Sequence, residues 1–297
     1  MRLFLFIVFS ISSLHVIAQE NKQPLLKVGI IADVQYCDEE NKGTRYYRLS
    51  VSKLKNAITH FRSEEVDFII NLGDLIDRDF ENFEPILNIF TQIDVPVYNV
   101  LGNHDFSVEE DQKEKVPPIL GLEKRYYSFS RFNWKFIFLD GNDISLYAND
   151  KGSDKYEIAR LMLDSLKGKN AANAHEWNGA IGKSQAEWIS QQLSQARKSG
   201  ENIILLSHFP VFPLNDHENL WNSLEIKNLI EQFSGKIVFL NGHTHRSSLN
   251  FSNNVCYVSF RGMVEETENS FAILEVYNDS LIINGFGAEE SHQINWE

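Results

Sequence analysis

The sequence of 297 residues contains only two cysteines, Cys37 and Cys256. Two cysteines are too few for the disulfide framework that stabilises many small secreted proteins, so the fold must rest on a hydrophobic core. We interpret both as small buried apolar residues. Whether they pair stays open, because a disulfide requires a short distance between the two residues and the sequence does not define that distance.

Basic residues are also scarce. The chain has 28 Lys and Arg against 41 Asp and Glu, which gives a formal net charge of −13. Binding along a nucleic-acid backbone requires clustered Lys and Arg, and the sequence contains no basic stripe. Bulk DNA or RNA binding is therefore excluded. The hydrophobic fraction of 43% is typical of a folded globular protein, and the length allows one large domain or two small ones.

No apolar run is long enough to span a membrane, which takes about 20 consecutive mainly apolar residues. The run Leu3–Phe9 follows Arg2, is then diluted by serines, and leads to Val16-Ile17-Ala18, which offers a small residue for cleavage. This pattern predicts a secretory signal peptide over residues 1–18 rather than a buried strand. We therefore expect an exported protein, periplasmic or extracellular, without a transmembrane anchor after cleavage.

Beyond the leader, short apolar runs alternate with segments of helical period, which predicts an α/β fold. A helix is expected over Tyr47–Phe61, a second from a capping box at Ser184, and a third over Ile226–Phe233, ending before Gly235. The tail from Val255 to Gly287 is rich in strand patterns. The expected strands before it are Leu26–Ile31, Val66–Asn71, Val95–Leu101, Trp134–Leu139, Asn202–Leu206 and Lys236–Leu240.

Residues 141–183 are polar and rich in Asn, Asp, Lys and Gly, apart from one amphipathic segment, Tyr156–Leu166. They have little apolar material for a core of their own. We interpret them as a lid-like insertion over the strand ends, within a single domain that covers residues 24–297.

Metal-ligand residue types follow five of the six expected strands. Because α/β sheets build their sites at the carboxyl ends of strands, these residues are expected to converge. Each cluster alone is compatible with ordinary turn chemistry, but five in succession are not. The clusters are Asp33-Val34-Gln35, Gly73-Asp74-Leu75-Ile76-Asp77, Gly102-Asn103-His104-Asp105, Ser207-His208 and Gly242-His243-Thr244-His245.

Seven donors are too many for one tetrahedral ion and suit two ions that share a ligand. A carboxylate bridges two metals more readily than an amide or an imidazole, so Asp74 is the natural bridge. Mixed oxygen and nitrogen donors without thiolate disfavour a closed structural zinc site, and Gln35 favours Mn²⁺, with Fe, Zn or Co as alternatives. The expected sets are Asp33, Gln35, Asp74 and His245 for one ion, and Asp74, Asn103, His208 and His243 for the other.

The same ordered motifs resemble the calcineurin-like metallophosphoesterase superfamily over most of the chain. Within it, the sequence most resembles the manganese-dependent ADP-ribose/CDP-alcohol diphosphatases, since Gln35 stands where most relatives place His. Further supporting stretches are Ile31–Tyr36, Gly43–Arg48, Trp177-Asn178-Gly179 and Gly262–Glu265. The resemblance implies a four-layer αββα sandwich of two mixed β-sheets flanked by helices, with a dinuclear metal site at the strand ends.

The resemblance also implies in-line attack on phosphorus by a metal-bridging hydroxide. His104 is carried over as the residue that stabilises or protonates the leaving oxygen, and Asp105 is expected to orient its imidazole. Two features depart from the animal enzymes: Asp105 stands where Glu is expected, and Arg246-Ser247-Ser248 replaces an acidic, Gly-rich stretch. Both bear on substrate preference.

We therefore expect hydrolysis of phosphoanhydride or phosphodiester bonds in small nucleoside diphosphate derivatives, such as ADP-ribose and CDP-alcohols. A broad phosphodiesterase or phosphomonoesterase is the alternative, and a metal-free binding module on the same fold is a second one. No protein partner is implied. Candidates for phosphate contact are Arg45 and Arg48, and candidates for stacking on a base are Tyr46, Trp177 and Phe209.

Overall fold

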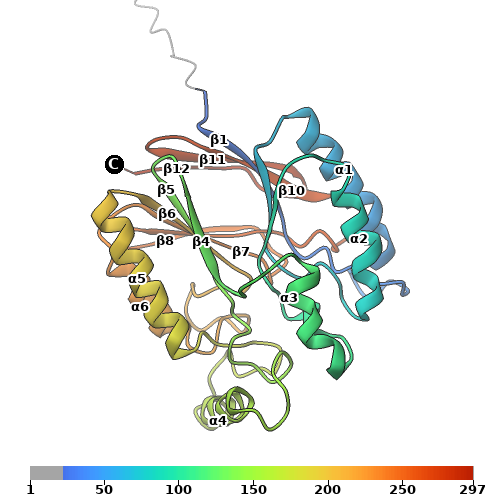
Figure 1. The fold of residues 1–297 in the computed structure, drawn as a ribbon, viewed down its shortest axis with the longest axis vertical. Coiled ribbons are helices and arrows are strands. Elements are labelled where there is room, and N and C mark those ends of the chain that lie inside the picture. Colours follow the sequence, from blue (N-terminus) through green and yellow to red (C-terminus); the bar gives the residue numbers. More distant parts are fainter. Residues whose placement is uncertain (1–22, 297) are drawn as a thin grey trace, which may run out of the picture.

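The computed structural model describes residues 23–296. The expected signal peptide over residues 1–18 lies outside this range. Two six-stranded sheets lie face to face in the centre of the molecule, with helices on both outer sides (Figure 1). The first sheet has the order β12 (His292–Asn295), β11 (Ser280–Gly287), β10 (Ser270–Val276), β1 (Leu26–Ile31), β2 (Phe68–Asn71) and β3 (Val97–Asn99). The second has the order β4 (Tyr127–Arg131), β5 (Trp134–Phe138), β6 (Asn202–Ser207), β7 (Ile237–Asn241), β9 (Val255–Ser259) and β8 (Ser248–Ser252).

Both sheets are mixed. β1, β2 and β3 run parallel, as do β5, β6, β7 and β9. The remaining strands, β4, β8, β10, β11 and β12, pair antiparallel with their neighbours. Parallel strands that are covered on both faces read as continuous apolar runs, which is why their positions were predictable from the sequence. In β6, Ile204 and Leu206 face the other sheet, whereas Ile203 and Leu205 face the outer helices.

Three apolar layers separate the four structural layers. One fills the space between the two sheets. A second packs the first sheet against α1 (Ser50–Ser63) and α2 (Phe83–Phe90), and a third packs the second sheet against α5 (Lys183–Ser199) and α6 (Ser223–Glu231). The predicted αββα sandwich is confirmed (Figure 1).

The predicted helices are present with shifted ends. A short 3₁₀ turn, Tyr47–Leu49, leads into α1, and α6 ends at Glu231. The capping box at Ser184 was wrong: α5 begins at Lys183 with Gly182 as its N-cap, and the Gly182 amide donates to the Asp143 carboxylate at 3.0 Å. The other short elements are α3 (Val116–Ile119) and 3₁₀ turns at Phe80–Asn82, His104–Phe106 and Glu110–Lys115.

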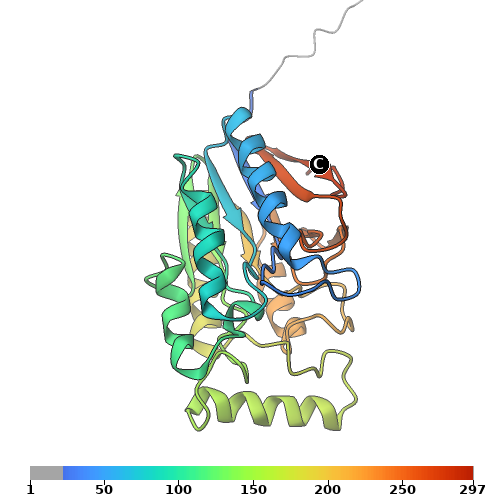
Figure 2. The same cartoon turned by 90° about the vertical axis from the view of Figure 1, so that its right-hand side faces the viewer.

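The segment of residues 141–183 contains α4 (Asp154–Gly168), which lies at the lower end of the molecule in the view of Figure 2. Ala159 and Leu163 of α4 pack in a small apolar cluster with Ile144, Ala180 and Trp221. The segment is therefore anchored to the second sheet through the loop that carries Trp221.

Cys37 and Cys256 are both buried and unpaired, in different apolar clusters. The interpretation of both as small buried apolar residues is confirmed. Within residues 23–296, no helix combines the length and apolar character needed to cross a membrane.

Candidate metal centre

The five predicted clusters meet at one edge of the sandwich, where β1, β2, β3, β6 and β7 end. All seven predicted donor residues lie there, and each of them is buried or nearly so. Donor atoms of Asp74, His208 and His243 lie within 4.8 Å of one another. The fold thus collects residues that are up to about 210 positions apart in the sequence.

The backbone at this edge is unusual. Five of the seven donor residues have a positive φ, a conformation that non-glycine residues rarely adopt: Asp33 (50°), Gln35 (43°), Asp74 (58°), His243 (68°) and His245 (54°). Such strain concentrates at functional sites, where the surrounding structure holds it in place.

Glycines allow the loops to approach closely. A Cβ at Gly102 would lie 2.1 Å from Asp74 Oδ1, and one at Gly242 would lie 2.5 Å from Asp33 Oδ2. The glycine that precedes the donor in these clusters therefore has the steric role that the sequence suggested.

The first donor group consists of Asp33, Gln35, Asp74 and His245. His245 Nε2 lies 3.2 Å from Asp33 Oδ1 and 3.1 Å from the Gln35 amide nitrogen, which also lies 3.0 Å from Asp74 Oδ2. The Gln35 Oε1 atom is buried and has no hydrogen-bond partner among the described residues. Because the two ends of an amide are interchangeable by rotation, this orphaned oxygen can be turned into the group as a metal ligand.

The second donor group consists of Asp74, Asn103, His208 and His243. His208 Nε2 lies 3.2 Å from Asp74 Oδ2, 3.1 Å from Asn103 Oδ1 and 3.1 Å from His243 Nδ1. The Asp74 carboxylate thus contacts members of both groups, as expected of a bridging ligand.

The chemistry of the donor set fits cations. His208 Nδ1 lies 2.9 Å from the Leu72 carbonyl oxygen and donates to it, so a neutral His208 turns the lone pair of Nε2 toward the carboxylate and amide oxygens. Lone pairs that face one another at about 3.1 Å repel unless a proton or a metal ion lies between them. Two divalent ions would meet this demand, with ligands drawn from the two groups described above.

The pKa values of the buried donor residues are shifted by their mutual charges. Burial lowers the pKa of His208, but the charges of Asp74 and Asp33 outweigh it and raise the pKa to about 9. Burial likewise lowers the pKa of His245, and Asp33 and Glu265 raise it to about 9. For Asp74, burial raises the pKa, but the neighbouring His208 brings it well below its usual range. The buried carboxylates therefore favour positive charge among them, which protonated His208 and His245 supply and which bound metal ions could supply instead.

Three residues that the sequence did not assign to the site hold the imidazoles in place. His245 Nδ1 lies 2.6 Å from Glu265 Oε1, and His243 Nε2 lies 3.1 Å from Glu218 Oε2 and 3.2 Å from Asn178 Oδ1. In each ring the remaining nitrogen faces the donor groups. Such contacts fix the tautomer and the orientation of metal-binding histidines. Lys53 in turn fixes the loop that carries Glu265. Its Nζ donates to the carbonyl oxygens of Met263, Glu265 and Glu266 at 2.7–2.8 Å.

Glu265→Gln is expected to weaken Mn²⁺ binding by about 10- to 100-fold, because the amide removes the charge that orients and polarises His245. The measurement is the Mn²⁺ concentration that gives half-maximal hydrolysis after chelation and dialysis. Glu266→Gln is the matched control, since this neighbouring side chain is exposed. If Glu265→Gln and the wild type required the same Mn²⁺ concentration, the conclusion that Glu265 orients His245 for metal binding would be contradicted.

His104 lies beside the second donor group, but its orienting partner is not the one expected. The predicted partnership with Asp105 is wrong, because the buried Asp105 carboxylate accepts hydrogen bonds from the backbone amides of Asp74, Leu75 and Gly102 at 2.8–3.1 Å. His104 Nδ1 instead lies 2.5 Å from Asp77 Oδ1. Asp105 therefore connects the loops that carry the donors through hydrogen bonds to their backbone amides. Asp77 is the residue that orients His104.

The protonation of these groups follows their surroundings. Burial and the charge of Asp74 raise the pKa of Asp105 to about 7. Burial lowers the pKa of His104, but the charge of Asp74 and the contact with Asp77 outweigh it and raise the pKa. His104 is therefore suited to carry a proton beside the donor groups.

A cavity of about 530 Å³ opens onto the donor groups. It is large enough for a small-molecule ligand. Arg45 lines it, flanked at 4.0 Å by Asp77 and at 3.9 Å by Glu265, whereas Arg48 binds Asp38 on the surface. The full lining is Gln35, Arg45, Asn103, His104, Ser107, Tyr147, Trp177, Glu218, His243 and His245.

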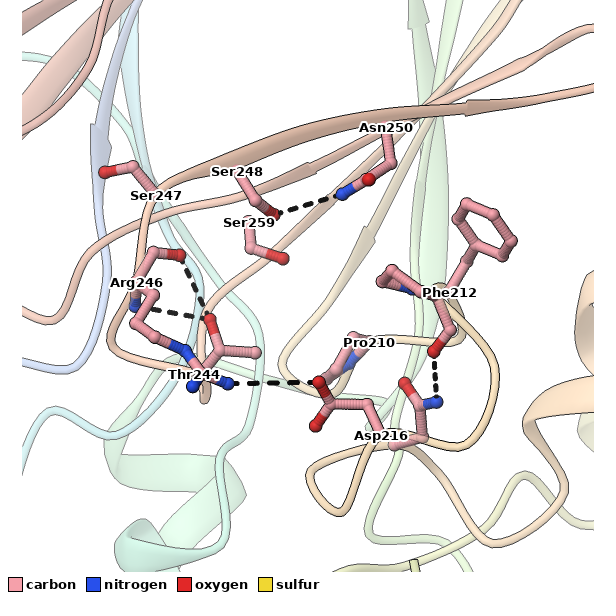
Figure 3. A pocket seen from close by; sticks show the side chains of 11 residues that line it. Pro210, Phe212, Asp216, Thr244, Arg246, Ser247, Ser248, Asn250 and Ser259 are labelled. Carbon is pink, nitrogen blue, oxygen red and sulfur yellow. Dashed lines mark hydrogen bonds and ion pairs between the residues drawn. The ribbon is translucent and has the colours of Figure 1, made fainter. Parts of the chain in front are cut away.

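A second cavity, of about 220 Å³, adjoins the metal centre on the side of Thr244 (Figure 3). Arg246 reaches across it toward Asp216, and the two charged groups are 3.9 Å apart. Ser247, Ser248 and Ser259 also line it. The stretch Arg246-Ser247-Ser248, which departs from the pattern expected of the animal enzymes, therefore contributes charged and hydroxyl groups to a cavity that Pro210, Phe212 and Pro213 also line.

Known proteins with similar sequences and structures match this chain over most of its length. The family model for calcineurin-like phosphoesterases matches residues 26–247. A manganese-dependent ADP-ribose/CDP-alcohol diphosphatase from Mus musculus is 28% identical over 93% of this chain and 94% of its own length. The protein of the same name from Arabidopsis thaliana is 27% identical over 89% of this chain and 95% of its own length. A dimetal phosphatase from Danio rerio has the same fold, with a TM-score of 0.84 at 23% identity, over 93% of this chain and 100% of that one.

Proposed function

The chain belongs to the calcineurin-like phosphoesterase family and is a metal-dependent hydrolase, and from this premise we propose that it cleaves the phosphoanhydride bond of small nucleoside diphosphate derivatives such as ADP-ribose and CDP-alcohols. The observation that supports the proposal is the convergence of seven donor residues at one edge of the two sheets. Four of them, Gln35, Asn103, His243 and His245, line the adjacent cavity. Relatives that bear the name of this activity match the chain over nearly its whole length.

We propose two divalent cations as cofactors, Mn²⁺ in particular, held by the two donor groups with Asp74 between them. Carboxylate and amide oxygens suit Mn²⁺, and the relatives are named manganese-dependent. When bound, such a pair lowers the pKa of a water ligand and neutralises the non-bridging oxygens of the phosphoryl group.

The residues of the chain supply position and proton transfer. His104, oriented by Asp77, is placed to donate a proton to the leaving oxygen. Arg45 lines the same cavity with a guanidinium that is attracted by Asp77 and Glu265 but not closely bound by either, so its N–H groups remain available for a second phosphate. In the proposed complex, one phosphate of a diphosphate binds at the donor groups and the other binds the adjacent Arg45 guanidinium.

The experiment is a substrate panel with the Mn²⁺-loaded protein. We expect ADP-ribose and CDP-choline to have the highest kcat/KM, ahead of cyclic nucleotides and phosphomonoesters. A preference for phosphomonoesters or for cyclic phosphodiesters would overturn the proposed substrate class and favour the broad phosphatase or phosphodiesterase alternative. Absence of hydrolysis of every substrate with Mn²⁺ would favour a binding module.

We also propose that the protein is exported, on the strength of the leader pattern in residues 1–18. The test is amino-terminal sequencing of protein recovered from the extracytoplasmic fraction, where the mature chain is expected to start near Gln19. Recovery of the intact Met1 form from the cytoplasm would contradict export.

A further inference from the structure

Trp177 is an exposed aromatic residue that lines the cavity of about 530 Å³ beside the donor groups. Its side chain lines the cavity, yet the residue keeps 43% of its surface accessible. Large aromatic side chains are normally placed where most of their surface is buried. An exposed indole beside a candidate active site therefore indicates a surface that a ligand covers.

The position of Trp177 relative to the donor groups is fixed by its neighbour in sequence, Asn178. The Asn178 side chain is fully buried, and its Oδ1 lies 3.2 Å from His243 Nε2. Its amide nitrogen donates to the carbonyl oxygens of Asn173 and His217, at 3.1 and 2.7 Å. Trp177 lines the same cavity as Asn103 and His243, so the indole stands beside the second donor group.

The orientation of the indole is also fixed by a stacked neighbouring ring. The His175 ring stacks on it with a centroid distance of 4.1 Å and an interplanar angle of 11°. The backbone of His175 is anchored in turn, since its carbonyl oxygen accepts a hydrogen bond from Trp221 Nε1 at 3.0 Å. One face of the indole is therefore covered by His175, and its exposed surface is presented in a fixed orientation beside the metal cavity.

The other aromatic candidates do not share this arrangement. Phe209 is completely buried and packs against the rings of His208 and His243. Tyr147 lines the cavity, but its hydroxyl donates to Asn142 at 2.8 Å, which commits it to the surrounding structure. Of the described aromatic residues that line this cavity, Trp177 alone offers an exposed indole.

We propose that Trp177 is the stacking platform for the nucleobase of the substrate, with the phosphates placed at the donor groups. This inference rests on the proposed function, because it assigns one part of a nucleoside diphosphate derivative. Stacking on an aromatic ring tolerates any base, since every base has a π face. The platform would therefore accept both adenine and cytosine derivatives, and it selects nucleotides over simple phosphate esters.

The test compares two product-like inhibitors that differ only by the base, AMP and ribose 5-phosphate. Their inhibition constants are measured against Mn²⁺-dependent hydrolysis of bis-p-nitrophenyl phosphate, for the wild type, Trp177→Ala and Trp177→Phe. We expect the inhibition constant of AMP to rise about 10-fold or more in Trp177→Ala and less in Trp177→Phe. The constant for ribose 5-phosphate is expected to stay unchanged.

Phe132→Ala is the matched control, because Phe132 is 65% exposed in the turn between β4 and β5, at the opposite end of the strands from the donors. Equal shifts for AMP and ribose 5-phosphate, or none for either, would overturn the platform. The inhibition constant of phosphocholine is measured in parallel. A shift for phosphocholine without one for AMP would also overturn the platform, since the indole would then bind a quaternary ammonium group. Failure of the proposed function is seen separately, as absence of ADP-ribose and CDP-choline hydrolysis by the wild type.

Discussion

Replacing Asp74 with alanine is expected to reduce Mn²⁺-dependent hydrolysis of bis-p-nitrophenyl phosphate by about 10³-fold or more. The reason is that this carboxylate contacts both donor groups at once: its Oδ2 lies 3.0 Å from the Gln35 amide and 3.2 Å from His208 Nε2. Its Oδ1 also accepts a hydrogen bond from the His104 backbone amide at 2.7 Å. In the proposed two-metal centre its removal would take away the ligand shared by both ions, and it would also remove a hydrogen-bond acceptor from the loop that carries His104.

The measurement for Asp74→Ala has two parts, turnover and metal content. The variant is expected to retain less than the wild-type amount of Mn²⁺ after dialysis, as determined by elemental analysis. Asp74→Asn serves as a second variant that keeps the shape of the side chain while removing its charge, so loss of activity is not confused with misfolding. Asp94→Ala, in an exposed turn before β3, is the control and should behave as the wild type. Wild-type turnover by Asp74→Ala would contradict the metal centre as assigned.

The α/β class and the donors could be predicted because both depend on short-range sequence patterns, whereas the arrangement of two sheets in an αββα sandwich was implied by the family resemblance. Runs such as Leu26–Ile31 are apolar on both faces of a covered parallel sheet, and the donors follow them within a few residues. The topology of α/β sheets then brings the carboxyl ends of these strands to one edge. No information about contacts between distant residues was needed for either step.

The contacts around the donors could not be predicted in the same way. Asn178 lies in the insertion and Glu218 in the loop after β6, and nothing in the local sequence indicates that both meet His243. Asp77 and Asp105 illustrate the limit: each is a carboxylate close to a donor, and adjacency in sequence suggested Asp105 as the partner of His104. The 3₁₀ turn at His104–Phe106 directs the Asp105 carboxylate to backbone amides instead, which leaves Asp77 to meet the imidazole.

Three of the four edge strands, β4, β8 and β12, were missed for a related reason. The side chains of β4 and β8 are half-buried or exposed, and so are those of β12 except Ile294, so none of the three has the continuous apolar run of a covered strand. Their pairing is defined by neighbours in the sheet rather than by their own composition. Periodicity alone therefore finds the centre of each sheet more readily than its edges.

His104→Ala is expected to slow the hydrolysis of diphenyl phosphate by about 10²- to 10⁴-fold and that of bis-p-nitrophenyl phosphate much less. His104 Nδ1 is held at 2.5 Å from Asp77 Oδ1, and the ring lines the metal cavity, so its Nε2 is the atom that can give a proton to the leaving oxygen. Phenolate is a strong base that needs this proton, whereas nitrophenolate is a weak base that departs without it.

The same comparison separates proton transfer from a merely structural role of His104. Asp77→Asn is expected to show the leaving-group dependence to a smaller degree, because it removes the charge that orients and supports the protonated imidazole. Asp79→Asn is the control, since Asp79 is exposed and two residues away. If His104→Ala lowered both rates equally, or lowered the Mn²⁺ content of the protein, the residue would act by supporting the donor groups. A rate ratio between the two esters that widens in His104→Ala while the Mn²⁺ content stays constant assigns the proton to the imidazole, because the variant then discriminates by the basicity of the departing oxygen more strongly than the wild type does.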